Sequence, residues 1–558
     1  MPTVTFEPED LYRLLGFRLP LERLEQLLPL IKCEVKEASP EMVSVEVTAD
    51  RPDLFSAEGI ARLLKGFLGK AEGSPKYRVA KSRVKVKVSR MVRRVRPRIV
   101  CAVVRGVSFT ESSIAQLMQL QEKLHETLCR RRSKASIGIY DLDKVKPPIT
   151  YTALKPEKIR FTPLEESKPL SAEEILTQTS KGLEYAHLLR GLPRYPLLVD
   201  REGQVLSMPP IINSEETKVT VETRNLFIDA TGFNPELLEE AVSVLVSSLA
   251  ERGAKVEAVQ VEYEGGGKVW TCQLKPRKMT VNPAEVNRLL GFNLPSGRMA
   301  KLLRRMRFDV EASNGRLKVS IPPFRSDILH PVDLAEEVAI AYGYHRIKPE
   351  PLRLPTVGSL LPASQASRRI RSLIAGYGFQ ETASYLLSSR ETQFERMGVK
   401  SGEAVELANP TSQEYSIVRV WLLPCLLEFL SKNVHVDYPQ KVFELGDVVL
   451  PDVEAETATR VETRLAAAIC NFKVSYEDVQ ALAYSLLEQL GVEGWRVEAF
   501  EHPSFLPGRT ARLLLGEVEI GLLGEIHPAV LEAFRLVNPV AAMELNLSKI
   551  FPETFKGK

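Results

Sequence analysis

An internal repeat constrains the fold of this chain more than any other feature. Residues 282–295 read NPAEVNRLLGFNLP, and residues 7–20 read EPEDLYRLLGFRLP. The match continues through an apolar pattern into two further pairs of segments: Arg51-Pro52-Asp53 with Arg325-Ser326-Asp327, and Ala57-Glu58-Gly59 with Ala335-Glu336-Glu337. The repeat predicts one small module, roughly helix–helix–strand–helix, that occurs twice.

The second copy places four carboxylates in a short span, at Asp327, Asp333, Glu336 and Glu337. Pro331 suits a first helical turn, so we expect a helix from there to about Tyr344. On that helix the last three carboxylates share one face. Oxygen donors without His or Cys suit Mg²⁺ before Ca²⁺. Acidic residues in a first turn also complement the helix dipole, and spacing alone favours neither interpretation.

The first copy has a degraded version of this cluster. It keeps Asp53 and Glu58, but Gly59 replaces the second glutamate and Asp333 has no clear counterpart. A metal site, if there is one, therefore belongs to the second copy. If it binds Mg²⁺ structurally, replacing Glu336 and Glu337 with Gln should abolish any dependence of thermal stability on Mg²⁺.

Length and composition describe a protein of several domains. The 558 residues predict about three or four domains, and 44% hydrophobic with 26% charged residues is typical of soluble globular proteins. No apolar run approaches a membrane span, and the start MPTVTFEPEDLYRL does not resemble a signal peptide. Six scattered cysteines without a CxxC pair favour free thiols in a reducing cytoplasm.

Basic residues gather between Lys76 and Arg98, where eleven Lys or Arg stand without any acid. Alternation of Val and Lys over residues 83–88 indicates an edge strand protected by lysines. No alternation explains the four arginines that follow, so we expect these to contact an anionic partner such as nucleic acid: Arg93, Arg94, Arg96 and Arg98.

Residues 99–265 predict an α/β domain with a polar pocket. A helix is expected from Ile114 to Arg131, and Arg130-Arg131-Arg132 would either satisfy its C-terminus or reach a phosphate backbone. Pro209-Pro210 predicts a rigid loop. Four polar residues near it would line a ligand pocket where strands end, although turns favour the same residue types: Ser207, Asn213, Asp229 and Thr231.

The last part of the chain predicts an antiparallel sheet with helices. Segments 364–377 and 415–432 carry more apolar residues than one buried face needs, which indicates an obligate partner. The chain contains no nucleophile motif, P-loop or GxGxxG.

These motifs together resemble one known family, the beta subunit of phenylalanine–tRNA ligase. Arg325-Ser326-Asp327 with Asp333, Glu336-Glu337 and Tyr342-Gly343-Tyr344 is similar to its B5 domain, and the first copy to its B1 domain. Residues 207–215 look like its B3/B4 editing domain. Residues 405–410, 443–446, 507–509 and 524–528 resemble its catalytic-like B6/B7 module. The order of modules agrees with the archaeal and eukaryotic type, which lacks the additional RNA-binding domains of the long bacterial type.

The resemblance implies a multidomain α+β and α/β protein in four parts: residues 1–90 (B1-like module with basic connector), 91–270 (B3/B4-like editing domain), 271–350 (B5, magnesium-binding) and 351–558 (class II synthetase-like, non-catalytic). It implies an α₂β₂ heterotetramer in which the alpha subunit binds ATP and phenylalanine and charges tRNA(Phe), with Mg²⁺ as cofactor. Val442 occupies the position where a catalytic class II enzyme carries a phosphate-binding arginine, so this chain alone is not expected to charge tRNA.

The implied editing reaction is hydrolysis of mischarged Tyr-tRNA(Phe). An apolar pocket rejects an added hydroxyl by only about a hundredfold, so a second site must bind the phenol. By the resemblance, Asp229 or Glu222 would accept from the phenol, and Ser207, Asn213 and Thr231 would place a water molecule. The alternative is a non-enzymatic tRNA-binding or scaffold protein, built from the same modules, with an inactive pocket.

Overall fold

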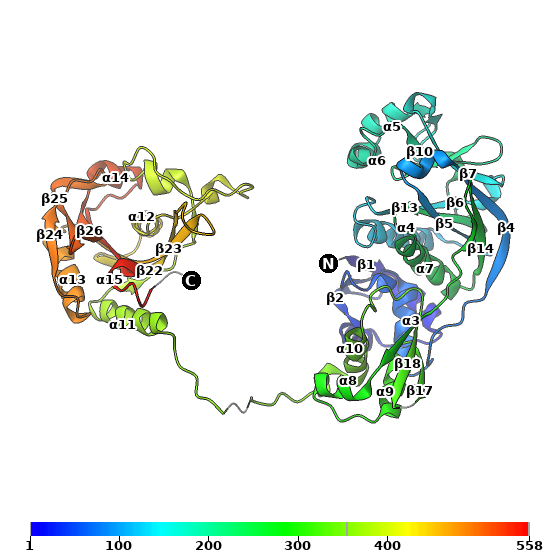
Figure 1. Cartoon of the computed structure of the whole chain (residues 1–558), viewed down its shortest axis with the longest axis horizontal. Coiled ribbons are helices and arrows are strands. Elements are labelled where there is room, and N and C mark those ends of the chain that lie inside the picture. The colour runs from blue at the N-terminus through cyan, green and yellow to red at the C-terminus, as the bar shows by residue number, and fades with distance from the viewer. Residues whose placement is uncertain (1, 314, 353–354, 556–558) are drawn as a thin grey trace. The chain divides into compact units, whose positions relative to one another are not determined.

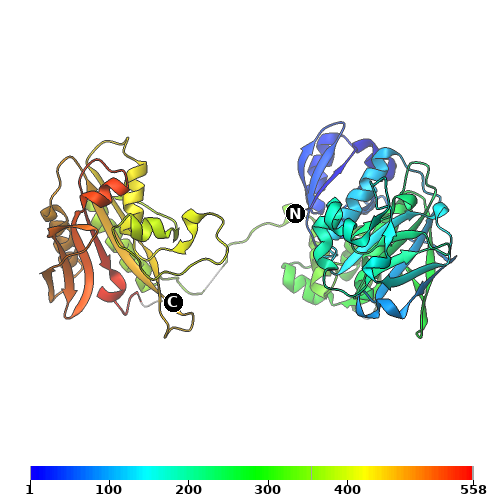
Figure 2. The same cartoon turned by 90° about the horizontal axis from the view of Figure 1, so that it is seen from above.

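The computed structural model describes residues 2–313, 315–352 and 355–555, and the chain divides into two compact units, residues 1–351 and 352–558 (Figures 1 and 2). Each unit has its own core. Over the described ranges, no helix is long and apolar enough to cross a membrane. The predicted fold class, a multidomain protein of mixed helices and sheets, is confirmed.

The repeat is confirmed as two copies of one fold within unit 1. Each copy has a three-stranded antiparallel sheet with the middle strand last in sequence, in the orders β1-β3-β2 and β16-β18-β17. The first copy contains β1 (Thr3–Phe6), α1 (Pro8–Leu15), α2 (Leu21–Leu27), β2 (Cys33–Ala38), β3 (Val43–Val47) and α3 (Ala57–Phe67). The second contains β16 (Arg277–Val281), α8 (Pro283–Leu290), α9 (Ser296–Arg305), β17 (Asp309–Ser313), β18 (Arg316–Ile321) and α10 (Pro331–Tyr342). The sequence predicted only one strand for each copy, because the outer strands are short and partly exposed.

Between the two copies in sequence lies a ten-stranded mixed sheet. Nine strands follow the order β12-β11-β10-β7-β4-β14-β5-β13-β6, and β15 pairs with β14. Their bounds are β4 (Val79–Val88), β5 (Arg98–Arg105), β6 (Ala135–Asp141), β7 (Ile149–Leu154), β10 (Tyr195–Val199), β11 (Val205–Met208), β12 (Ile212–Asn213), β13 (Asn225–Gly232), β14 (Lys255–Tyr263) and β15 (Lys268–Thr271).

One face of this sheet is covered by two helices, α4 (Glu111–Glu126) and α7 (Pro235–Glu251) (Figure 1). Thr110 caps α4 through a capping box, and Asn234 caps α7. Helix α7 packs on β5 and β13 and also contacts α3 of the first module. A single hydrophobic core therefore runs from the sheet through α7 into both modules.

Two predictions about this region are wrong. Strand β4 lies between β7 and β14, so its lysines do not protect an edge; Val84, Val86 and Val88 are buried while the lysines between them face solvent. Helix α4 ends at Glu126, five residues before the predicted Arg131, because residues 130–132 adopt left-handed backbone conformations that no right-handed helix can include.

Unit 2 has a seven-stranded sheet in the order β19-β22-β23-β27-β26-β25-β24, antiparallel except for the β19–β22 pair. Its strands are β19 (Gln380–Glu381), β22 (Gln440–Pro451), β23 (Thr459–Cys470), β24 (Trp495–Ala499), β25 (Phe505–Leu515), β26 (Val518–Ile526) and β27 (Val540–Asn546). Helices α11 (Pro362–Gly376) and α13 (Tyr476–Gln489) share one core with the sheet, and α12 (Leu423–Lys432) and α14 (Pro528–Ala533) share another. The predicted antiparallel sheet with helices is confirmed.

The apolar surplus predicted at residues 415–432 is mostly used inside unit 2. Leu422, Leu423, Leu426 and Leu427 are buried in the core beneath α12. A different group of apolar side chains stays exposed, and we call it the apolar patch: Tyr385 (76% exposed), Leu386 (44%), Leu387 (36%) and Tyr415 (36%). The rings of Tyr385 and Tyr415 meet edge to face.

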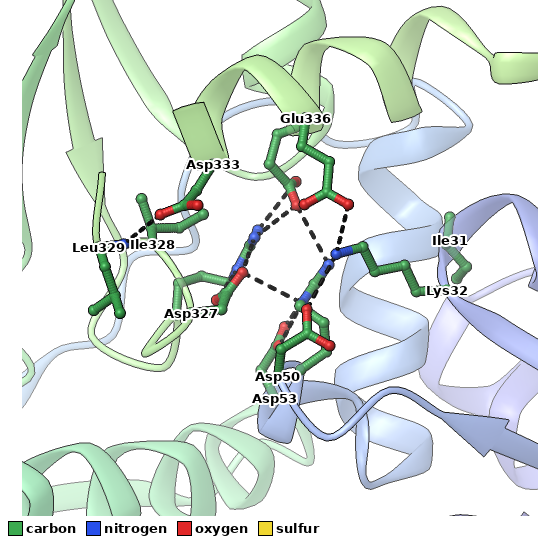
Figure 3. Close-up of polar contacts among 12 residues, drawn as sticks. Ile31, Lys32, Asp50, Asp53, Asp327, Ile328, Leu329, Asp333 and Glu336 are labelled. Atoms are coloured by element: carbon green, nitrogen blue, oxygen red, sulfur yellow. Dashed lines mark hydrogen bonds and ion pairs between the residues drawn. The ribbon is translucent and has the colours of Figure 1, made fainter. Parts of the chain in front are cut away.

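The two modules of unit 1 meet through buried arginines, whose aspartate partners Asp53 and Asp327 are labelled in Figure 3. Arg51 donates two hydrogen bonds to Asp53 (2.9 and 3.0 Å), and its counterpart Arg325 donates two to Asp327 (2.8 and 2.6 Å). Glu337 accepts from both arginines, at 3.5 Å from Arg51 and 2.7 Å from Arg325. These arginines and Glu337 are at most 2% exposed, so the network joins the modules in a medium where an unpaired charge is costly.

We predict that Arg325→Met destabilises unit 1 by about 3–5 kcal/mol, because it leaves two buried carboxylates without their main partner. Arg18→Met is the matched control; Arg18 pairs with Glu9 at the surface, where such a pair contributes about 0–1 kcal/mol. Denaturant unfolding can be followed by the fluorescence of Trp270 after Trp421 and Trp495 are replaced with Phe. Equal losses in the two variants would contradict the role of the network.

Candidate functional site

A cavity of about 330 Å³ lies in unit 1, where the two ends of the curled sheet approach each other. Strand β6 ends the sheet on one side, and β11 and β12 end it on the other. Side chains bridge this seam: Asn213 donates to the carbonyl of Ile139 (3.3 Å), and the hydroxyls of Tyr140 and Ser207 are 2.7 Å apart. The cavity has the size of a small-molecule site and is lined by residues of α4, β6, β11, β12 and β13 and of the Pro209-Pro210 turn.

Asp229 lines the cavity from the middle of β13, not from a strand end as predicted. It lies opposite Cys101 of β5 and Gly138 of β6, and its side chain is 1% exposed. Pairing of β13 continues beyond Asp229 to Gly232. Because strand residues alternate between faces, Asp229 points away from α7, to the same face as Phe227 and Thr231.

Tyr140, the partner of Asp229, was not among the predicted site residues. Its hydroxyl donates to Asp229 Oδ1 (2.6 Å), which leaves the phenol oxygen able to accept from Ser207. A side-chain carbon at Gly138 would overlap this hydroxyl, so the glycine makes room for the contact. A glycine inside a strand is the signal that could have pointed here, because it often marks a close approach.

Burial raises the pKa of Asp229 to about 7, although the hydrogen bond from Tyr140 and the charge of Arg96 act to lower it. Burial and the neighbouring Asp229 also raise the pKa of the Tyr140 phenol well above its usual range. The cavity thus contains a carboxyl group that changes charge near neutral pH beside a phenol that stays protonated. A buried acceptor of this kind can select a ligand that carries a hydroxyl.

The other predicted pocket residues have different positions. Ser207 and Asn213 line the cavity, but Thr231 does not. Thr231 is fully buried, and its hydroxyl accepts from Arg96 Nε (3.0 Å). Arg96, which was predicted to contact nucleic acid, is only 4% exposed and also donates to the carbonyls of Thr231 and Arg132. Glu222 is exposed and does not line the cavity.

The outer edge of β6 faces the cavity with backbone groups. The amide of Ile137 donates to His125 Nε2 (2.9 Å), and its carbonyl accepts from Gln121 (2.8 Å). In an antiparallel ladder every second residue has this orientation, so the amide of Ile139 points to the same edge. Burial lowers the pKa of His125 to about 4, so His125 is neutral near pH 7 and its Nε2 is occupied.

The four predicted metal residues do not form a single carboxylate cluster. Arg325 binds both Asp327 and Glu337. Burial raises the pKa of Asp327, but the charge and hydrogen bonds of Arg325 outweigh burial and lower this pKa to about 2. Asp333 accepts from the backbone amides of Leu329 and His330 (2.7 Å each), and Glu336 pairs with Lys32 (2.9 Å; Figure 3). Within the described residues, no three acidic, His or Cys side chains are placed to hold a metal ion. As arranged, the residues do not fit Mg²⁺.

Unit 2 contains a second cavity, of about 680 Å³, beside the apolar patch. Val442, which stands where a phosphate-binding arginine was expected in a catalytic relative, is buried in β22. Arg419, which follows the short strand β21 (Ile417–Val418), donates to Glu444 of β22 (2.5 Å), to Ser384 (2.8 Å) and to the carbonyl of Asp447 (2.8 Å). A guanidinium with three protein partners is not free to bind a phosphate.

Comparison with known proteins agrees with this architecture. Family models match at residues 95–264 (B3/4 domain), 279–344 (tRNA synthetase B5 domain) and 347–547 (phenylalanyl tRNA synthetase beta chain CLM domain). The chain is 42% identical over 557 residues to the phenylalanine–tRNA ligase beta subunit of Pyrococcus horikoshii, covering 99% of this chain and 100% of the relative. It is also 42% identical to the beta subunit of Korarchaeum cryptofilum, covering 98% of both chains.

A solved structure is similar as well. The crystal structure of an N-terminal fragment of the P. horikoshii phenylalanyl-tRNA synthetase beta subunit is 43% identical, covers 61% of this chain and 99% of the fragment, and gives a TM-score of 0.59. Fold and matches together define a subunit of an aminoacyl-tRNA synthetase. The chain belongs to the phenylalanine–tRNA ligase beta subunit family.

The magnesium site stays a prediction, and the ion pairs change what we expect of it. Because Arg325 and Lys32 already bind three of the four carboxylates, Mg²⁺ should stabilise unit 1 no more than NaCl of equal ionic strength. Thermal unfolding with MgCl₂ and with EDTA checks this, with Asp333→Asn/Glu336→Gln as the control variant. A rise in melting temperature that needs Mg²⁺ and disappears in that variant would support the metal site instead.

Proposed function

We propose that this chain is the editing and assembly subunit of a phenylalanine–tRNA ligase and that its ten-stranded domain hydrolyses Tyr-tRNA(Phe). The observation that carries the proposal is a buried carboxylate, Asp229, that faces a cavity large enough for an aromatic side chain. A site built to bind a hydroxyl disfavours a ligand without one by about 10⁴–10⁵-fold, because its polar group is then left unpaired. Phenylalanine would be such a ligand.

In the proposed complex, the phenol of the misplaced tyrosine donates to Asp229. Tyr140 uses only one of the acceptor positions of this carboxylate. Ser207 and Asn213 lie on the other side of the seam, and in this proposal they orient a water molecule toward the ester. The edge amide of Ile139 would donate to the ester carbonyl as negative charge develops on it. Thr231 acts indirectly, because it holds Arg96.

Charging is proposed to take place on an alpha subunit, with ATP, phenylalanine and Mg²⁺ bound there, in an α₂β₂ assembly in the cytoplasm. The engagement of Arg419 and the burial of Val442 support a non-catalytic role for unit 2. The apolar patch is the proposed contact with the alpha subunit, because clustered exposed aromatic and leucine side chains are typical of interfaces. The same proposal divides the chain into four domains, with boundaries after residues 90, 270 and 350.

A second candidate is a tRNA-binding scaffold with an inactive pocket. The occupation of Asp229 Oδ1 by Tyr140 is the observation that favours it, because an internal phenol already satisfies one carboxylate oxygen. The two candidates differ in one measurement: an editing subunit deacylates Tyr-tRNA(Phe) in complex with alpha, and a scaffold does not.

We predict that Asp229→Ala lowers kcat/KM for Tyr-tRNA(Phe) deacylation by about 10- to 100-fold, the loss of one hydrogen bond to a charged group. Charging with phenylalanine should not change, because the proposed charging site is on another chain. Both activities are measured on the same mutant complex, and His187→Ala, an exposed histidine of the same domain, is the control. Equal loss of both activities would mean that Asp229 only stabilises the fold.

Deacylation should also depend on pH through Asp229. Only the ionised carboxylate is a pure acceptor, so kcat/KM should rise with pH to a plateau, with an inflection at about 7. Tyr140→Phe removes a hydrogen bond that lowers this pKa, so the inflection should move to higher pH. Rates are corrected for spontaneous hydrolysis. An inflection that survives in Asp229→Asn would assign the titration to another group.

A further inference from the structure

Three consecutive arginines after α4 adopt the left-handed helical conformation. The φ angles of Arg130, Arg131 and Arg132 are 51°, 49° and 62°. Residues other than glycine rarely visit this region, and then as single residues. The segment Cys129–Lys134, which we call the arginine turn, closes on itself through a hydrogen bond from the amide of Lys134 to the carbonyl of Cys129 (3.2 Å). Strained backbone persists only where its surroundings hold it in place.

The surroundings of the arginine turn do hold it, through the third arginine. Arg132 is 7% exposed and donates to the carbonyl of Ile211 (2.8 Å) and to Glu122 (2.7 Å), and its guanidinium covers the ring of Tyr185. Arg96 donates to the carbonyl of Arg132 (3.2 Å). A side chain at Gly232 would overlap the carbonyl oxygen of Lys134. The turn is therefore fixed to the Pro209-Pro210 loop and to the end of β13.

The first two arginines of the turn point away from this anchor. Arg130 and Arg131 are exposed, and so is Lys134. Neither guanidinium forms a hydrogen bond or ion pair with any residue in the described part of the chain. Arg132, which lines the cavity, pairs instead with Glu122. Two exposed guanidinium groups without an anionic partner, carried on a held backbone, are suited to bind phosphate through paired N–H donors.

The arginine turn also lies at the cavity. Arg132 lines the cavity, so Arg131 and Arg130 are one and two residues from its wall. An aminoacyl ester that enters the cavity is attached to the last nucleotide of an RNA, and phosphodiester groups must follow it out of the opening. Lys181 and Lys218, which also line the cavity, pair with Glu184 and Glu215. The free positive charge is thus on the turn.

We propose that the arginine turn binds the phosphodiester backbone of the single-stranded 3′ end of the tRNA and thereby guides the ester into the cavity. This inference rests on the proposed editing function. The left-handed backbone prevents residues 130–132 from continuing helix α4. In a helix, the arginine side chains would point in different directions around the axis and could not bind neighbouring phosphates. Such contacts set position and affinity but do not read base sequence.

The test compares charge-removing and charge-keeping variants of the full alpha–beta complex. Arg130→Gln/Arg131→Gln removes both charges, and Arg130→Lys/Arg131→Lys keeps them. Arg201→Gln, at an exposed arginine of the same domain, is the matched control. For Tyr-tRNA deacylation, the Gln variant should raise KM by about tenfold with kcat little changed. It should also reduce the slope of log KM against log salt concentration by about 1.4, because each lost phosphate contact of a single strand accounts for about 0.7. The Lys variant should restore most of both effects.

A small substrate separates this inference from the editing proposal. On 2′(3′)-O-tyrosyl adenosine, which has no phosphodiester, the Gln variant should equal the wild type. Equal losses on both substrates, or an unchanged KM and salt slope for Tyr-tRNA, would overturn the phosphate-binding role. If the wild type hydrolyses neither substrate, the editing proposal fails. The inference is then decided by binding of uncharged tRNA: wild type but not the Gln variant should bind intact tRNA more tightly than tRNA trimmed of its single-stranded 3′ end.

Discussion

The arrangement of unit 1 depends on a buried set of arginine–carboxylate pairs between two copies of the same module. Arg51 and Arg325 make the same two hydrogen bonds to the aspartate two residues later, and Glu337 accepts from both. Charges removed from water in this way are tolerated only when each has its partners, so the set forms as a whole or not at all. This requirement fixes the relative placement of the modules, and the shared core carries that placement through α7 to the sheet that contains the cavity.

Much of this fold could be predicted from the sequence because its local signals agree. The repeat predicted the two modules, and Pro331 predicted the start of α10. The candidate site was harder to predict. Ser207, Asn213 and Asp229 were correctly grouped around the Pro209-Pro210 turn, but nothing local in the sequence brings Tyr140 to Asp229. That contact requires β6 and β13 to pair with Gly138 opposite Asp229, and the contact of Tyr140 with Ser207 depends in addition on how far the ten-stranded sheet curls.

The roles of the charged residues were the hardest feature to predict from the sequence. The acidic stretch at residues 327–337 suggested a metal site, because sequence spacing cannot show that Lys32 and Arg51, about three hundred residues earlier, lie beside it. Arg96 was assigned to a partner and is instead buried against Thr231, whereas the arginines at 130 and 131 were placed in a helix that ends before them. For the acidic stretch and for Arg96, a side chain distant in sequence decides the role of the residue. For Arg130 and Arg131, the left-handed backbone decides it.

The seam between β6 and β11–β12 has a consequence for how the domain can move. Elsewhere in the sheet, neighbouring strands are joined by backbone ladders, but across the seam the bridging contacts are side-chain hydrogen bonds from Tyr140, Asn213 and Arg132. The two ends of the sheet are therefore held together by a few side-chain hydrogen bonds and not by a strand ladder. Rotation of those side chains would widen the seam without breaking any strand pairing. The domain can therefore open most easily along the seam, where the cavity lies, and close again with its strand register unchanged.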